Sequence, residues 1–426
     1  MVDRDTVFEI ANSNIRFGIG VTREVGMDIR DRGLARVMVL TDPYLSDLSP
    51  VQTVLESLYA EGIDFEFFDQ VRVEPTEKSL LEAISFAKHA GKFDGYVAVG
   101  GGSTIDTAKV VSLYMTYPTE FIDYVNVPIG RGLPVPGPID PVIAIPTTAG
   151  TGSETTGVAI FDFMELSVKT GIAHRHLKPI LGLIDPENTS TLPREVAVSS
   201  GVDVLCHALE SYTAMPFGQR PSPKSPNFRP SYQGANPISD VWALQAMRLV
   251  VEFLPRVIAD SGDIEARSNM LLASTMAGMG FGSAGVHLPH GMSYPVAGLV
   301  KQYSHIGYPV DYPLVPHGIA VIVNAPAVFK FTFAASPERH LQVAEILGAN
   351  IEAVSKDQFG TTLSSCLLTF MRELGIPQGL APLGYGKDDI PALVHGTLSQ
   401  NRITKLAPRL ANEQDLYRLF TEALNY

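Results

Sequence analysis

The feature that most constrains the fold is a regular alternation of strand-like and helix-like segments in the first half of the chain. Strand-like runs occupy residues 37–41, 63–68, 96–99 and 142–145, and apolar residues recur at helical spacing in 51–59 and 80–90. Residues 128–141 contain five prolines and three glycines and are expected to form a loop. Repeated strand–helix–strand units of this size predict a Rossmann-like domain, a parallel sheet with helices on both faces.

The second half of the chain has a different pattern, which begins near residue 193. Long apolar stretches with helical spacing occupy residues 202–212, 241–253, 264–279, 341–347 and 361–374. The segment 216–237 contains six prolines, too many for a helix or a central strand. A chain of 426 residues is long enough for two cores. We therefore predict an α/β domain over 1–194 and an all-helical domain over 195–426.

Charge and cysteine content exclude several classes of protein. Lys and Arg number 32 against 45 for Asp and Glu, a net charge of −13, and a surface this acidic repels the phosphates of nucleic acid. The only two cysteines, Cys206 and Cys366, do not make a disulfide framework. The first residues lack the basic start and apolar run of a secretory signal and the Arg/Ser-rich character of a transit segment. These features predict a protein of a reducing compartment, the cytoplasm, that binds no nucleic acid.

The stretch between Arg267 and Lys301 contains no side chain with a full charge and is long enough for a membrane helix. Six glycines, two histidines and two prolines interrupt it. These residues would break and polarise a spanning helix. We therefore expect a buried helix that leads into a functional loop, and no membrane association.

Two glycine- and threonine-rich segments follow predicted strands in the first domain. Gly100 to Lys109 begins with three glycines that let a ligand approach the backbone, and a helix whose N-terminal N–H groups suit a pyrophosphate follows. Pro146 to Glu154 offers hydroxyl groups at the end of the next strand, where α/β sheets bind ligands. The first segment is not a G-x-G-x-x-G fingerprint, and a simple tight turn is the alternative. Asp42 at an earlier strand end would accept hydrogen bonds from an adenosine ribose and favour NAD over NADP, unless it only forms a turn before Pro43.

One aspartate and three histidines in the second domain are candidate metal ligands. Asp203 and His207 are four residues apart on a predicted helix and therefore share a face. His290 and His317 each precede a glycine, and we expect both in loops. An Asp-plus-three-His set suits Fe²⁺ or Zn²⁺ and leaves room for a substrate oxygen. The alternative for the first pair is an ordinary contact on a helix surface.

These motifs together resemble the iron-containing (group III) alcohol dehydrogenases, in order and spacing, over nearly the whole chain. The matching segments are Gly100–Lys109, Pro146–Glu154, Gly201–Glu210, His290–Met292 and Pro316–Gly318. The resemblance implies a dehydroquinate synthase-like fold with the active site between two domains. It also implies a metal ion that acts as a Lewis acid on the substrate hydroxyl and a nicotinamide that accepts hydride. The residues expected to hold NAD are Asp42, Gly101, Gly102, Ser103, Asp106, Thr147, Thr148, Thr151, Ser153 and Lys169.

Within that family, several stretches resemble the hydroxyacid-oxoacid transhydrogenase subgroup. They are 13–18, 71–76, 152–161, 231–240, 290–295 and 404–408, and the proline-rich segment 216–237 also belongs to the subgroup. The resemblance implies hydride transfer through bound NAD from 4-hydroxybutyrate to 2-oxoglutarate, by a homo-oligomer such as a dimer. Because the eukaryotic members are mitochondrial, the matrix is the alternative location. The alternative activities are an ordinary NAD-dependent alcohol dehydrogenase and a dehydroquinate synthase-like lyase.

The sequence leaves three features of the predicted site undecided: one nucleotide contact, the proton donor and the cation that binds the substrate carboxylate. Glu74 stands where many relatives have asparagine, which puts the usual nucleotide contact there in doubt. Tyr294 stands where many have a histidine, so Tyr294, His287 or water is the candidate for proton delivery. Both substrates are carboxylates and call for a cation. The candidates are Arg220, Lys224, Arg229 and Lys301, each with the alternative of a solvated surface charge.

Overall fold

The computed structural model describes residues 4–166 and 168–426, which form two compact units. The first unit consists of Ala11–Leu192 and Ser261–Leu271. The second consists of the described residues up to Ile10, together with Pro193–Asp260 and Leu272–Tyr426. Two short segments, the N-terminal residues and 261–271, therefore depart from a simple division of the chain into a first and a second part.

The first unit is built on a six-stranded, entirely parallel sheet in the order β1-β8-β5-β4-β2-β3. Its strands are β1 (Asn14–Phe17), β2 (Arg36–Leu40), β3 (Asp64–Phe68), β4 (Gly95–Gly100), β5 (Val142–Pro146) and β8 (Leu181–Ile184). The four strands expected from the sequence are the central and edge strands β2 to β5. The predicted parallel sheet is confirmed.

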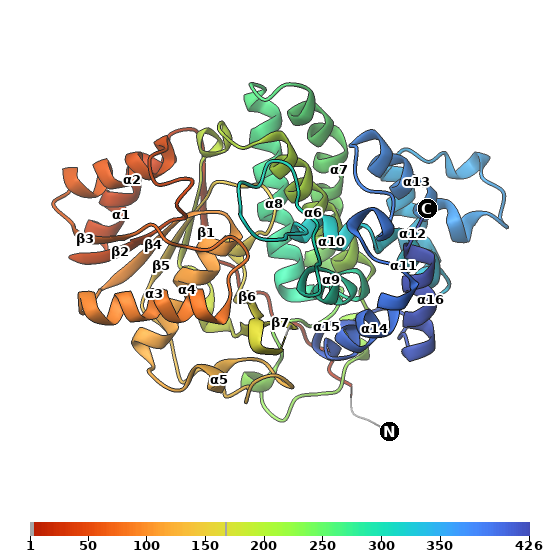
Figure 1. The fold of residues 1–426 in the computed structure, drawn as a ribbon, viewed down its shortest axis with the longest axis horizontal. Helices are drawn as coiled ribbons and strands as arrows, with labels where there is room; N and C mark the ends of the chain where they lie inside the picture. Colours follow the sequence, from red (N-terminus) through yellow and green to blue (C-terminus); the bar gives the residue numbers. More distant parts are fainter. Residues whose placement is uncertain (1–3, 167) are drawn as a thin grey trace. The chain divides into compact units, whose positions relative to one another are not determined.

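Alternate residues of the strands β2, β4 and β5 enter two different cores, one on each face of the sheet. Val37 and Val39 of β2 pack with α1 (Val25–Asp31) and α2 (Ser49–Ala60). Met38 and Leu40 face the other core, with α3 (Glu77–Ala90) and α4 (Gly102–Thr116). Figure 1 shows these two helix pairs on opposite sides of the strands. Because helices cover both faces of the sheet, residues that point to either face are apolar, and the strands read as continuous apolar runs.

An antiparallel pair of strands, β6 (Val158–Phe163) and β7 (Val168–Ala173), forms a separate two-stranded sheet that the sequence analysis missed. Phe161 and Ile172 of this pair are buried in the core that contains α3 and α4. A short helix, α5 (Phe121–Tyr124), precedes the proline-rich residues 128–141, which contain no helix or strand, as expected.

The second unit is helical. Its helices are α6 (Arg194–Thr213), α7 (Pro237–Ala259), α9 (Leu288–Gly298), α10 (His317–Ile322), α11 (Ala325–Thr332), α12 (Pro337–Ile346), α13 (Phe359–Glu373), α14 (Ile390–Leu398), α15 (Asn401–Thr404) and α16 (Glu413–Ala423). Helix α8 (Ile264–Ala284) starts in the 261–271 segment and ends in this unit. The five predicted helical stretches fall on α6, α7, α8, α12 and α13. The helical second half is confirmed.

The proline-rich segment 216–237 has only short 3-10 turns before α7 begins. Asn236 ends it as the N-cap of α7, where its side chain accepts a hydrogen bond of 3.0 Å from the Ser239 N–H. Pro237 occupies the first helical position, where its missing N–H costs nothing. In the part of the chain that the structure describes, no helix combines the length and the apolar character needed to cross a membrane.

Candidate functional site

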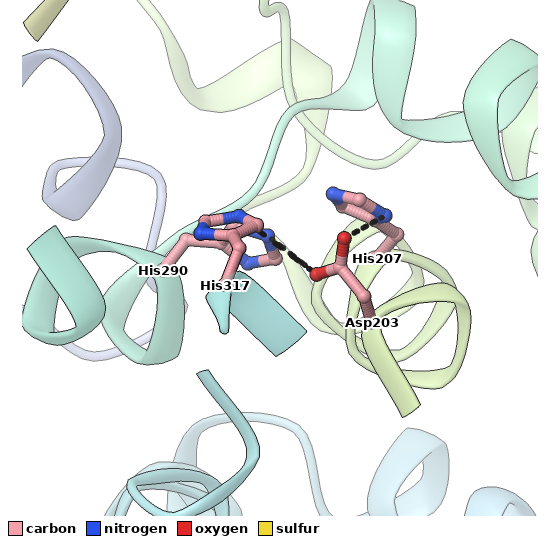
Figure 2. Close-up of side chains that lie close together, drawn as sticks. All are labelled: Asp203, His207, His290 and His317. Carbon is pink, nitrogen blue, oxygen red and sulfur yellow. Dashed lines mark ion pairs between the residues drawn. The ribbon is translucent and has the colours of Figure 1, made fainter. Parts of the chain in front are cut away.

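The second unit brings the four predicted metal ligands together. Asp203 and His207 lie one turn apart on α6, and His290 and His317 come from α9 and α10. One Asp203 carboxylate oxygen lies 3.6 Å from His290 Nε2 and 3.8 Å from His317 Nε2, and the other lies 3.8 Å from His207 Nδ1. The four potential ligand atoms lie within 4.8 Å of one another. Figure 2 shows the four side chains converging on one point.

The donor atoms of this cluster fit a divalent cation. Asp203 Oδ1, His207 Nδ1 and His290 Nε2 are buried and have no hydrogen-bond partner among the described residues. Buried polar atoms are almost always satisfied, so three unsatisfied atoms that face one another indicate a ligand that binds all of them. One carboxylate oxygen and three imidazole nitrogens are the donor set of Fe²⁺ and Zn²⁺ sites.

The expectation that His290 and His317 lie in loops is wrong. His317 is the first residue of α10, and His290 lies in the first turn of α9. The preceding prolines, Pro289 and Pro316, mark the helix starts, where proline is tolerated, and do not indicate loops.

The glycines after the two histidines permit close packing and not loop flexibility. A Cβ on Gly318 would lie 1.9 Å from the Ser199 carbonyl oxygen of α6. A Cβ on Gly291 would lie 2.4 Å from Thr404 Cγ2. Only glycine at these positions lets the two ligand-bearing helices approach their neighbours so closely.

Glu210 supports the cluster and was given no role in the sequence analysis. This fully buried carboxylate accepts a 2.5 Å hydrogen bond from His290 Nδ1 and a 2.6 Å bond from the His287 backbone N–H. The bond to Nδ1 fixes the His290 ring so that Nε2 faces Asp203, the arrangement of a carboxylate–histidine–metal triad. Glu210 follows Asp203 by seven residues and His207 by three, so its helical spacing could have identified it.

The electrostatics of the cluster keep both carboxylates ionised. Burial opposes the charge on Asp203, but the neighbouring histidines outweigh it and hold its pKa well below the usual range. The pKa of Glu210 is also lowered, because His290 offsets its burial. Burial lowers the pKa of His207 to about 3. Burial also disfavours the charged form of His290, yet Glu210 and Asp203 raise its pKa to about 9. The negative carboxylates and neutral His207 are the forms that bind a cation.

In the first unit, the two glycine- and threonine-rich segments lie against each other. Thr147 N–H donates to the Gly100 carbonyl oxygen at 3.1 Å. A Cβ on Gly102 would lie 2.5 Å from Thr151 Cγ2, and one on Gly101 would lie 3.4 Å from Thr148. Gly101 is the N-cap of α4 and offers no side chain, so the first N–H groups of this helix are available to an anion.

Asp106 and Ser153, both expected to hold NAD, are bonded to the buried Lys109. The ammonium of Lys109 lies 3.2 Å from Asp106 and 2.5 Å from Ser153 Oγ, and Ser153 Oγ donates to Asp106 at 2.5 Å. Asp106 also accepts from the Ile160 N–H at 2.9 Å. This network ties α4 to the segment 146–154 and to β6, so these side chains fix the shape of the two segments.

Ser103 and Lys169 are linked through Glu74. The Glu74 N–H donates to Ser103 Oγ at 3.1 Å, and its carboxylate lies 2.7 Å from the Lys169 ammonium. Asp162 lies 3.2 Å from the same ammonium, and these two carboxylates raise the pKa of Lys169 against the effect of its burial. Glu74 has a φ of 53°, a left-handed conformation that favours glycine or asparagine.

Asp42 lies at the end of β2 and is buried. Its carboxylate accepts a 2.9 Å hydrogen bond from the Tyr44 N–H, and burial raises its pKa. One carboxylate oxygen therefore stabilises the turn after β2, which is the structural alternative weighed for this residue, and recognition of a ribose stays a prediction.

Comparison with known proteins identifies the family. Residues 12–186 match the family described as iron-containing alcohol dehydrogenase, and residues 231–424 match its C-terminal domain. Proteins named hydroxyacid-oxoacid transhydrogenase, mitochondrial, from Rattus norvegicus and Bos taurus are each 58% identical over 422 residues, 99% of this chain and 90% of theirs. The chain belongs to the iron-containing alcohol dehydrogenase family. A crystal structure of 1,3-propanediol oxidoreductase has the same fold, with a TM-score of 0.85 and 27% identity over 98% of this chain and all of that one.

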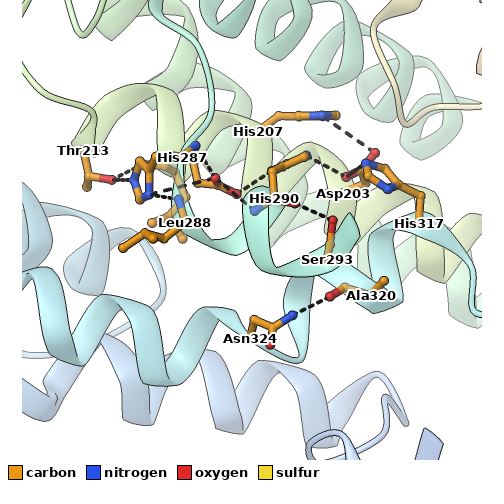
Figure 3. Close-up of polar contacts among 12 residues, drawn as sticks. Asp203, His207, Thr213, His287, Leu288, His290, Ser293, His317, Ala320 and Asn324 are labelled. Atoms are coloured by element: carbon orange, nitrogen blue, oxygen red, sulfur yellow. Dashed lines mark hydrogen bonds and ion pairs between the residues drawn. The ribbon is translucent and has the colours of Figure 1, made fainter. Parts of the chain in front are cut away.

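His287 and Tyr294, the two candidate proton donors, have different surroundings. The fully buried ring of His287 accepts from the Leu288 N–H at Nδ1 and lies 3.1 Å from Thr213 Oγ1 at Nε2 (Figure 3). Burial lowers its pKa to about 4, which favours the neutral ring, and a neutral ring that accepts at Nδ1 carries its proton on Nε2. Tyr294 follows His290 by one helical turn on α9, and proton delivery by either residue stays a prediction.

Three of the four cations expected to bind a substrate carboxylate already pair with carboxylates of the protein. Arg220 is buried and lies 2.5 Å from Asp5, and Arg229 lies 3.0 Å from the same carboxylate. Lys301 lies 2.8 Å from Asp389. The two arginines of the proline-rich segment therefore attach it to the N-terminal segment, which explains their presence without a substrate.

Proposed function

We propose that this protein is a metal-dependent, NAD-linked oxidoreductase that acts as a hydroxyacid-oxoacid transhydrogenase, with 4-hydroxybutyrate as hydride donor and 2-oxoglutarate as acceptor. The observation that carries the proposal is the 58% identity, over 99% of this chain, to proteins of that name. The complete set of four candidate metal ligands is consistent with it.

Asp203, His207, His290 and His317 would hold the metal ion, with Glu210 orienting His290. When bound, Fe²⁺ or Zn²⁺ would supply Lewis-acid activation of the substrate oxygen. We propose Fe²⁺ as the resident ion, because the family of this chain is described as iron-containing. Zn²⁺ is the alternative, because the donor set suits both ions. Elemental analysis of the purified protein distinguishes them.

The segments 100–103 and 146–154 would hold NAD. The N–H groups at the start of α4 would bind the pyrophosphate, and Gly101 and Gly102 add no side chain there. When bound, NAD would supply a hydride acceptor for one substrate and a hydride donor for the next. Tyr294 would move the proton that accompanies the hydride.

A second candidate is an ordinary NAD-dependent alcohol dehydrogenase that releases its cofactor. The match to 1,3-propanediol oxidoreductase favours it, since the fold accommodates that activity in a protein 27% identical. The two activities differ in whether NAD stays bound between half-reactions.

One assay separates these activities. Protein purified without added cofactor is mixed with 4-hydroxybutyrate and 2-oxoglutarate, with and without added NAD. A transhydrogenase forms succinate semialdehyde and 2-hydroxyglutarate in both reactions, with ping-pong kinetics. Strict dependence on added NAD, with accumulation of NADH from an alcohol alone, would instead establish the ordinary dehydrogenase. A dehydroquinate synthase-like lyase would convert neither the two acids nor an alcohol with NAD.

The relatives' names include the word mitochondrial, which supports the matrix for this chain over the expected cytoplasm. Assembly as a homodimer is a further part of the proposal, and analytical ultracentrifugation tests it.

A further inference from the structure

The two substrates of the proposed reaction share one chemical feature. In both 4-hydroxybutyrate and 2-oxoglutarate, two methylene groups separate the reacting carbon from a carboxylate. A single cation at a fixed distance from the metal cluster could therefore recognise both. Arginine suits this task, because its planar guanidinium binds a carboxylate through two parallel hydrogen bonds.

Arg402 on α15 is a cation of this kind. It is half-buried, and among the described residues no aspartate or glutamate forms an ion pair with it. Its guanidinium lies over the ring of Tyr232, with 5.2 Å between Cζ and the ring centroid. A cation–π contact of this kind holds the guanidinium in place while its N–H groups stay able to bind a carboxylate.

A continuous series of aromatic contacts connects Arg402 to the metal cluster. The Tyr232 ring packs edge-on against Phe281, with centroids 6.4 Å apart. Phe281 stacks on the ring of His207 at 4.0 Å and an interplanar angle of 11°. The platform under Arg402 thus rests, through one phenylalanine, on a candidate metal ligand.

A second, independent contact connects the same region to another candidate ligand. Thr404, two residues after Arg402, packs where a Cβ on Gly291 would lie, and Gly291 follows His290. The stretches 231–240 and 404–408 also meet, since a Cβ on Gly285 would lie 2.5 Å from Leu406 Cδ1 and 2.9 Å from Tyr232 Cβ.

We propose that Arg402, stacked on Tyr232, binds the carboxylate that both the hydroxy acid and the oxo acid carry two methylene groups from the reacting carbon. The assignment rests on the proposed function for the identity of the substrates. In both half-reactions, the position of Arg402 would then select substrates with two methylene groups between the reacting carbon and the carboxylate.

The test compares wild type with Arg402→Gln, Arg402→Lys and a matched control, Lys405→Gln, which removes an exposed cation three residues away. For each metal-loaded protein, kcat/KM is measured with 4-hydroxybutyrate, with 1-butanol and with 2-oxo acids that have one, two or three methylene groups. Binding of 2-oxoglutarate is measured separately by calorimetry. Metal content and thermal unfolding show whether each variant is intact.

We expect Arg402→Gln to lower kcat/KM for both acids about 10- to 100-fold, the loss of one charge-assisted carboxylate contact. The rate with 1-butanol and the metal content should stay at wild-type values, and the preference for two methylene groups should disappear. Arg402→Lys, which keeps the charge without the fork geometry, should lie between wild type and Arg402→Gln. Lys405→Gln should behave as wild type.

The results that overturn the assignment differ from those that overturn the proposed function. Equal losses for acids and 1-butanol, or unchanged acid kinetics, would show that Arg402 does not contact the carboxylate. If wild type transfers no hydride between the two acids but binds 2-oxoglutarate, and Arg402→Gln does not bind it, the proposed reaction fails and the carboxylate site stands. If wild type does not bind 2-oxoglutarate at all, both fail.

Discussion

Polar side chains have opposite roles in the candidate metal site and in the nucleotide segments, 100–109 and 146–154, which we propose hold NAD. In the cluster, buried donor atoms of Asp203, His207 and His290 face one another and have no hydrogen-bond partner among the residues that the structure describes. In the nucleotide segments, Asp106, Ser153 and Lys109 satisfy one another. The first arrangement leaves side chains to bind a ligand, whereas the second leaves the backbone to bind one.

The difference explains why the two regions should respond differently to substitution. A side chain that ligates a metal ion cannot be replaced without losing one of the bonds to that ion. A backbone N–H survives almost any substitution that leaves the local geometry unchanged, so only changes that move the segment should matter. The following substitutions test this difference between the two regions.

The largest effect is expected from His317→Ala. Removing one of four ligands should abolish metal retention and lower activity by more than the roughly 10- to 100-fold typical of outer partners. Metal content by elemental analysis and turnover are the measurements. This variant is cleaner than His290→Ala, which would also leave Glu210 buried without its histidine partner. A metal content equal to wild type would contradict the ligand assignment.

Glu210→Gln should have the next largest effect. The amide keeps the shape of the side chain but is a weaker acceptor for His290 Nδ1–H, so metal affinity should fall about 10- to 100-fold. Competition with a chelator measures the affinity. Glu265→Gln, a change of the same kind at an exposed position, is the control, and an affinity equal to that control would show that Glu210 does not orient His290.

Gly102→Ala should affect only the nucleotide. The new Cβ would lie 2.5 Å from Thr151, and the segment must shift at a cost of about 1–3 kcal/mol, which predicts NAD binding weaker by about tenfold or more. Fluorescence titration with NADH measures the affinity, and metal content should not change. Gly218→Ala, where a Cβ meets nothing within 4 Å, is the matched control. Wild-type affinity for NADH in Gly102→Ala would rule out a close backbone approach.

Asp42→Asn should have the smallest effect. Asparagine keeps the acceptor for the Tyr44 N–H and removes the charge that would repel a 2′-phosphate, so the preference for NAD over NADP should fall by about fivefold or less. The ratio of the two dissociation constants is the measurement. An unaltered ratio would leave Asp42 as a turn residue only.

The local patterns of the sequence determined which elements form and which residue types can bind. Short strand-like runs and apolar residues at helical spacing located β2 to β5 and the long helices, because those patterns depend only on which faces are buried. The short strands β1 and β8 and the β6–β7 pair were missed. Strands β1 and β8 have four residues each and contain few alternations. Strands β6 and β7 have six residues each, but they pair only with each other, outside the parallel sheet.

The tertiary structure alone decided how the functional residues are arranged. Proline and glycine around His290 and His317 fit both a loop and a helix start, and the contacts of Gly291 with Thr404 and of Gly318 with Ser199 select the helix start. The bond from His290 to Glu210 joins residues 80 positions apart. Helical spacing places Glu210 on the face of α6 that carries Asp203 and His207. No local pattern encodes its contact with His290, because that contact forms only when distant segments share one core, so the sequence could name the candidate ligands but not the bond that orients His290.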